Sequence, residues 1–108
     1  MAKVFTVCPI ELNPGVTDNA VESFFRDPKN ERVTPIGMKW HFLKADRGER
    51  KGKYLFLLEF DSVETRNRLF PVEGEGVSDQ SFADRWNPIF AGMDKLIEFS
   101  FCDYVEMT

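Results

Sequence analysis

The sequence predicts one α+β domain built around an antiparallel sheet, and three observations support this. The chain has 108 residues, 43% of them hydrophobic, which suits a single packed core. Strand-like and helix-like segments follow one another along it, and clear turn signals separate them. Eleven Phe, two Trp and two Tyr should dominate the core, because each buried aromatic ring removes about 150–250 Å² from water.

The N-terminal part predicts a strand and then a short helix. Residues 3–10 alternate in polarity and are rich in Val and Phe, which is typical of a strand, and an Asn-Pro-Gly turn follows. Residues 17–19 all favour the N-cap position of a helix. We expect this helix to end at Asp27, because a residue that precedes proline avoids the helical conformation.

The middle of the chain predicts a hairpin. Residues 36–45 and 53–60 are both rich in apolar and aromatic side chains, and residues 46–49 between them form a polar turn. The basic residues near the hairpin tip are expected to be solvated. They are Lys44, Arg47, Arg50, Lys51 and Lys53.

The second half predicts two helical regions and a last strand. A helix over residues 63–70 follows two good cap residues, and the next proline ends it. After an acidic, glycine-containing loop at residues 72–77, apolar residues recur at helical spacing. We expect this longer segment to be divided into two short helices at Pro88. Residues 98–106 then predict the closing strand.

The order strand, helix, strand, strand, helix, strand is the ferredoxin-like βαββαβ arrangement, a four-stranded antiparallel sheet with helices on one face. A sheet with one solvated face should alternate apolar and polar residues. In residues 53–60, however, Leu55 and Leu57 occupy one register while mainly aromatic residues occupy the other. Both faces therefore need cover, and a second copy of the chain is the simplest source.

Composition and charge limit the expected partners. The formal net charge is −4, so a phosphate backbone would be repelled and nucleic acid is not an expected partner. No window approaches the roughly 18–20 apolar residues of a membrane span, and the N-terminus lacks a secretory signal pattern. We expect a cytoplasmic protein that makes no contact with a membrane. Cys8 and Cys102 do not have the spacing of a disulfide framework or a metal site, and both are expected to be buried, inert thiols.

Two stretches resemble the dimeric α/β-barrel superfamily. They are the strand-to-helix passage Tyr-Leu-Phe-Leu-Leu-Glu-Phe-Asp-Ser-Val-Glu-Thr-Arg at residues 54–66, and the helical segment 82–97 with its Arg-Trp-Asn-Pro run. In that superfamily, ferredoxin-like subunits place their sheets face to face and enclose an apolar cavity in each half. Its members include cofactor-free monooxygenases, isomerases, polyketide cyclases and proteins without known activity.

The resemblance implies a homodimer that binds a small hydrophobic organic molecule and uses no cofactor. On this basis we expect either a cofactor-free monooxygenase, isomerase or cyclase, or a non-catalytic module for ligand sensing or stress-type dimerisation. Fold alone does not choose between an enzyme and a binding module. A single His in the chain does not support a metal site built from several histidines.

His41 and Glu59 are the candidate catalytic residues. His41 is the one side chain whose ordinary pKa lies near neutrality, which is what general acid or base catalysis requires. Glu59 lies in the other strand of the hairpin and could share a face with His41, where burial would raise its pKa. The alternative is structural: a hydrogen-bonded His41, and a salt link between Glu59 and Lys39.

The candidate ligand-binding residues are Trp40, Tyr54, Trp86 and Asn87. Members of the resembled superfamily project polar or aromatic side chains into their cavity, and these residues are the counterparts that this chain offers. Trp86 also shares helical spacing with other aromatic residues, so a role in the core is its alternative.

Overall fold

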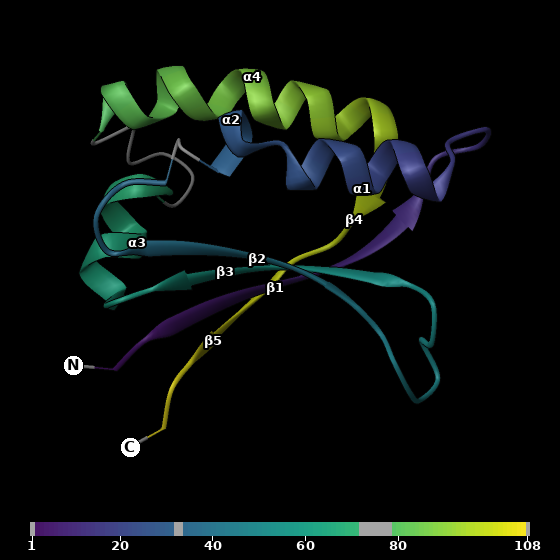
Figure 1. Ribbon diagram of the computed structural model, residues 1–108. Coiled ribbons are helices and arrows are strands. Elements are labelled where there is room, and N and C mark those ends of the chain that lie inside the picture. Colours follow the sequence, from purple (N-terminus) through teal and green to yellow (C-terminus); the bar gives the residue numbers. More distant parts are fainter. Residues whose placement is uncertain (1, 32–33, 72–78, 108) are drawn as a thin grey trace.

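The computed structural model describes residues 2–31, 34–71 and 79–107 (Figure 1). The predicted loop at residues 72–77 lies outside this part of the chain. The fold is ferredoxin-like, with an antiparallel sheet and helices, as the sequence predicts. The elements, in chain order, are β1 (Val4–Leu12), α1 (Asp18–Arg26), α2 (Pro28–Glu31), β2 (Met38–Lys44), β3 (Tyr54–Phe60), α3 (Val63–Leu69), α4 (Gln80–Leu96), β4 (Ile97–Phe99) and β5 (Cys102–Val105).

Strand β1 is the centre of the sheet. The strand order is β2-β3-β1-β4, and β5 also pairs with β1. In the register, Val7 of β1 lies between Leu57 of β3 and Cys102 of β5. Figure 1 shows α1, α2 and α4 together on one side of this sheet, and both termini emerge at the same end. We call the side under these helices the covered face and the other side the open face.

The sheet has five strands, so the expectation of four was wrong. The predicted last strand is broken: β4 pairs with residues 10–12 of β1, and β5 with residues 4–7. Lys3 and Asn13 both hydrogen-bond to this edge through their backbone, so the odd-numbered residues of β1 turn their peptide groups toward it. Pro9 is one of them and has no N–H to donate, which accounts for the interruption opposite it.

Helix α4 runs through Pro88 without a break, so the predicted pair of short helices was wrong. The buried side chains Phe82, Trp86, Ile89 and Met93 continue across the proline at helical spacing. Burying each such side chain contributes roughly 1.5–3 kcal/mol. Together they outweigh the roughly 3 kcal/mol that an interior proline costs. No described helix is both long and apolar enough to cross a membrane.

Side-chain caps begin each of the three longer helices. Thr17 accepts a hydrogen bond from the backbone N–H of Ala20, as predicted for α1, and Ser62 and Asp79 cap α3 and α4 in the same way. Helix α1 ends at Asp27 as expected. The short α2 that follows was not predicted; it starts at Pro28, a residue that suits the first turn of a helix.

Aromatic side chains fill the core between helices and sheet. Phe25 of α1 stacks on Phe42 of β2 with ring centroids 4.5 Å apart, and Trp40 contacts Phe56 at 4.7 Å. Cys8 is buried in this core, but Cys102 is exposed, so the expectation of two buried thiols was wrong for Cys102. Cys102 is exposed because it lies on the open face of β5, which no described helix covers.

Replacing Pro88 with Ala tests whether packing holds α4 together across the proline. The side chain of Pro88 is exposed, so Pro88→Ala should lose little packing and gain a backbone donor. We expect the free energy of unfolding to rise by about 1–2 kcal/mol, after allowing for the freer unfolded chain. Urea denaturation measures it, with Asn87→Ala as the neighbouring control. A loss of stability would contradict this account.

Candidate functional site

A cavity of about 500 Å³ lies between the covered face of the sheet and helices α3 and α4. The pleat of the sheet sends alternate side chains to this face. Thr6 and Cys8 of β1 and Phe56 and Leu58 of β3 form its floor. These four belong to facing pairs in the register, Thr6 with Leu58 and Cys8 with Phe56.

Aromatic rings form most of the remaining wall. Trp86, Phe90 and Met93 reach the cavity from α4. Phe101, in the break between β4 and β5, also lines it and is 70% exposed. Phe99 and Asp103, two residues away on either side, line the cavity as well, so alternate residues of this edge face it. The other apolar lining residues are Phe70 and Pro71.

One end of the cavity is polar. Thr6 and Asp103 face each other on β1 and β5, and the Thr6 hydroxyl donates a hydrogen bond of 2.6 Å to Oδ1 of Asp103. Nη1 of Arg66, from α3, contacts Oδ2 of the same carboxylate at 2.5 Å. The Arg66 side chain is 20% exposed. This polar cluster, Thr6, Arg66 and Asp103, carries one positive and one negative charge.

The Cys8 thiol stays protonated at neutral pH. Burial raises its pKa, and the negative charge of Asp103 raises it further, to about 11. Because the thiolate is the reactive form, this residue serves as a small apolar wall of the cavity. The expectation of an inert Cys8 agrees with this geometry.

The candidate catalytic residues lie on the open face, away from this cavity. His41 and Glu59 share that face as the sequence suggested, with His41 Nε2 3.5 Å from Glu59 Oε1. Lys3 and Lys39 also approach Glu59, at 3.4 and 4.0 Å. His41 is 38% exposed and Glu59 17%, and neither lines the cavity.

The pKa of Glu59 is lowered, so the expectation that burial would raise it was wrong. Burial does act in the raising direction, but the hydrogen bond and charge of Lys3, the charge of Lys39 and the hydrogen bond of His41 outweigh it. Glu59 is therefore an ionised centre of a cationic cluster, which is the electrostatic setting of a salt link rather than of a carboxyl group tuned as a base.

The structure separates the four candidate ligand-binding residues. Trp86 lines the cavity, whereas Asn87 lies on the exposed side of α4. Trp40 packs behind the cavity wall, with its ring centroid 6.1 Å from that of Trp86. Its buried Nε1 has no hydrogen-bond partner within the described ranges.

Tyr54 belongs to a second, smaller cavity of about 290 Å³ beside α1. Its hydroxyl donates to Glu22. Burial, then the hydrogen bond to Glu22, raise the pKa of Tyr54 to about 12. Its phenol therefore remains neutral, and in this position it ties β3 to α1.

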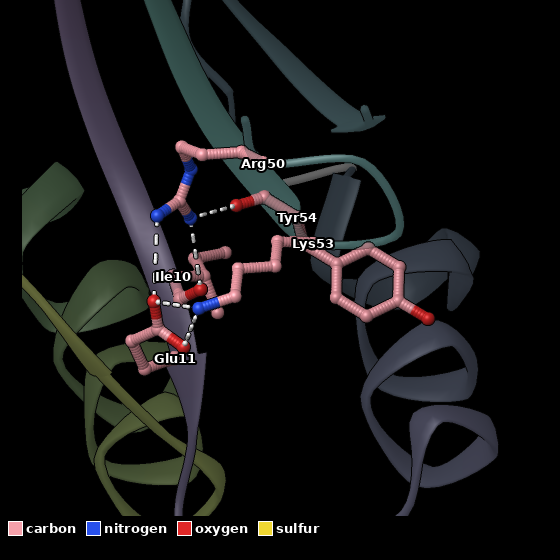
Figure 2. Close-up of polar contacts among 5 residues, drawn as sticks. All are labelled: Ile10, Glu11, Arg50, Lys53 and Tyr54. Atoms are coloured by element: carbon pink, nitrogen blue, oxygen red, sulfur yellow. Dashed lines mark hydrogen bonds and ion pairs between the residues drawn. The ribbon is translucent and has the colours of Figure 1, made fainter. Parts of the chain in front are cut away.

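The basic hairpin tip is partly folded back onto the sheet (Figure 2). Arg50 donates to Glu11 and to the backbone carbonyl groups of Ile10 and Tyr54, at 3.2–3.3 Å. Lys53 donates to Glu11 at 3.0 Å. Lys53 remains exposed and Arg50 is half-buried, so both side chains keep contact with solvent, as expected, while they fasten the hairpin to β1. Hydrogen bonds from Lys53 and Arg50 lower the pKa of Glu11.

Arg66 and Asp103 are site residues that sequence reasoning missed. The available signals were a charged residue inside the apolar closing strand and an Arg at the end of the passage that resembles the dimeric α/β barrels. Among the described residues, no group of three or more His, Cys, Asp or Glu side chains is placed to hold a metal ion.

The lowered pKa of Glu59 predicts a pH dependence of stability. A carboxyl group whose folded pKa lies below its ordinary value of 4.5 stabilises the fold above that pH, and the contribution disappears as the pH falls through the folded pKa. The difference in free energy of unfolding between the wild type and Glu59→Gln should therefore shrink as the pH falls below about 4.5. Denaturation at each pH measures it.

The matched control is the same comparison in a Lys3→Met background. Because Lys3 supplies the largest lowering contact, the loss of unfolding free energy that Glu59→Gln causes should be smaller in that background at every pH above about 5. A difference between wild type and Glu59→Gln that grows as the pH falls would contradict the direction of the pKa shift.

A comparison with protein-family models finds no match for the chain, and neither does a comparison with curated proteins. Solved structures do match. A dabb family protein with a ferredoxin-like fold from Mesorhizobium loti is 16% identical, with a TM-score of 0.56 and 100% of both chains covered. Hydroxynitrile lyase from Passiflora edulis is 14% identical, with a TM-score of 0.57, over 97% of this chain and 94% of that chain.

A third match is a dimeric protein of unknown function with a ferredoxin-like fold from Bacteroides fragilis. It is 11% identical, with a TM-score of 0.52 and 94% of both chains covered. At such low identity the likeness concerns the fold. The predicted fold is confirmed: the chain has a ferredoxin-like fold, as do the Mesorhizobium loti and Bacteroides fragilis proteins.

Proposed function

We propose that this protein is a homodimer that binds a small hydrophobic organic molecule in the cavity between the sheet and α4. The observation that supports this most strongly is the cavity itself. Its volume of about 500 Å³ is in the usual range for small-molecule sites, which are mostly apolar with a few converging polar groups. Its aromatic walls and single polar cluster match that description.

The open face supports the dimer. Phe5, Val7, Leu55 and Leu57 lie there half-buried without a covering helix, and Tyr104 beside them is 57% exposed. An apolar surface of this kind is typical of an interface. The Bacteroides fragilis protein of the same fold is dimeric, so we take a second copy of this chain as the cover.

The proposal also includes a catalytic activity. The Passiflora edulis enzyme is a hydroxynitrile lyase, so a fold of this kind can carry an enzyme. We propose a cofactor-free monooxygenase, isomerase or cyclase acting on a hydrophobic substrate. His41 and Glu59 remain the proposed acid–base pair only for a ligand that reaches the open face, because neither borders the cavity.

The second candidate is a non-catalytic ligand sensor or dimerisation module. It is favoured by the position of His41, since the cavity is then lined without a side chain whose ordinary pKa is near neutrality. The cytoplasmic location and the lack of a nucleic-acid or membrane partner stay predictions from composition.

Filling the cavity tests the binding proposal. Naphthalene serves as an uncharged apolar probe, measured by equilibrium dialysis and by the rise in melting temperature that binding produces. Cys8→Phe places a ring in the cavity floor and should weaken naphthalene binding by about tenfold or more. Leu57→Phe makes a similar enlargement on the open face of β3 and should leave binding unchanged.

Overpacking at Cys8 can cost about 1–3 kcal/mol, so a second measurement uses an unfilled cavity. In the wild-type protein, naphthalene should change the fluorescence of Trp86, which lines the cavity, in proportion to occupancy. Binding that survives Cys8→Phe, or that Leu57→Phe alone abolishes, would move the ligand to the open face and contradict the proposal.

A further inference from the structure

The polar cluster at the end of the cavity presents donors and acceptors side by side. Asp103 accepts one hydrogen bond at each carboxylate oxygen, from Thr6 and from Arg66. A carboxylate has about four lone-pair sites in all, so each of its oxygens can accept another hydrogen bond. The cavity is lined by all three residues of the cluster, which puts these groups within reach of a ligand.

Arg66 has guanidinium N–H groups that are available to a ligand. Its guanidinium carries five N–H groups. Nη1 is directed to Asp103, and Nε donates to Asn67 at 2.8 Å. Within the ranges that the structure describes, Nη2 makes no hydrogen bond. The side chain is four-fifths buried, so a ligand acceptor would compete with little bulk water for this group.

The charges of the cluster balance, and this decides what kind of ligand head group fits. An anionic head would be attracted to Arg66 but repelled by Asp103 at nearly the same distance, and it would also lose its hydration on entering an apolar cavity. A cationic head group would be attracted to Asp103 but repelled by Arg66, and it would also lose its hydration. An uncharged group that accepts from Arg66 and donates to Asp103 satisfies both partners at a much smaller desolvation cost.

We propose that the cavity selects ring-bearing hydrophobic ligands whose head group is uncharged and both accepts and donates hydrogen bonds, such as a carboxamide, and that it discriminates against the matching carboxylates. The aromatic walls bind the ring, and Arg66 and Asp103 bind the head. The inference rests on the proposed function, because it assumes that the ligand occupies this cavity.

A matched series of naphthalene compounds tests the proposal. The wild-type protein is titrated near neutral pH with 2-naphthamide, 2-naphthoate and naphthalene, and the dissociation constants are measured by equilibrium dialysis. We expect 2-naphthamide to bind about tenfold or more tightly than 2-naphthoate and more tightly than naphthalene. Tighter binding of 2-naphthoate would overturn the proposal, because Arg66 would then act as a simple anion site.

Removing the balancing charge should change this selectivity. Asp103→Asn keeps a polar side chain of the same shape and leaves Arg66 uncompensated. The ratio of 2-naphthoate to 2-naphthamide affinity should then rise by about tenfold or more. Asp84→Asn, which changes an exposed carboxylate on α4, is the control for net charge and should leave the ratio unchanged. An unchanged ratio in folded Asp103→Asn would also overturn the proposal.

Two outcomes separate this inference from the proposed function. If naphthalene binds but 2-naphthoate binds most tightly, the cavity holds a ligand and only the head-group selectivity is wrong. If none of the three compounds binds, the cavity proposal and this inference both fail. If Asp103→Asn does not fold, the order of the three affinities in the wild-type protein still tests the head-group proposal, because that measurement needs no variant.

Discussion

The structure depends on one constraint, which is that both faces of the central strands β1 and β3 are apolar. On the covered face, Phe56 and Leu58 pack toward the helices, and on the open face Leu55 and Leu57 remain half-buried at the surface. One layer of helices shelters only the first set. The covered face thus forms a packed core that holds the cavity, whereas the open face is an apolar surface that a partner could bury.

The same alternation separates the charged groups of the sheet into two sets. The Glu59 carboxylate lies among Lys3, Lys39 and His41 on the open face, where the two lysine charges and the hydrogen bonds of Lys3 and His41 lower its pKa. Asp103 lies on the covered face and pairs with Arg66 inside the polar cluster. A second copy would enclose the first set at the dimer interface, while a ligand would meet the second set. The proposed dimer interface and the proposed ligand site therefore lie on opposite sides of one sheet.

Local signals predicted much of the fold, and long-range pairing decided the rest. The helix caps, the hairpin and the apolar registers of β3 are properties of short segments, so the sequence indicates them directly. The break opposite Pro9 depends on which edge of β1 its peptide faces, which only the strand pairing determines. The continuity of α4 through Pro88 depends on what its buried side chains contact. The polar cluster joins Arg66 to Asp103, which are 37 residues apart, and neither belongs to a motif.

The most direct test of the account is whether the open face is covered in solution. Sedimentation equilibrium of the wild-type chain at micromolar concentration should give twice the mass of the 12.5 kDa chain. Leu57→Glu places a charge in the centre of the open face and should yield a folded monomer, because an unpaired charge is costly at a buried interface. Ser81→Glu, at an exposed site on α4, should remain a dimer. A stable wild-type monomer at that concentration would contradict the claim that the second apolar face needs a partner.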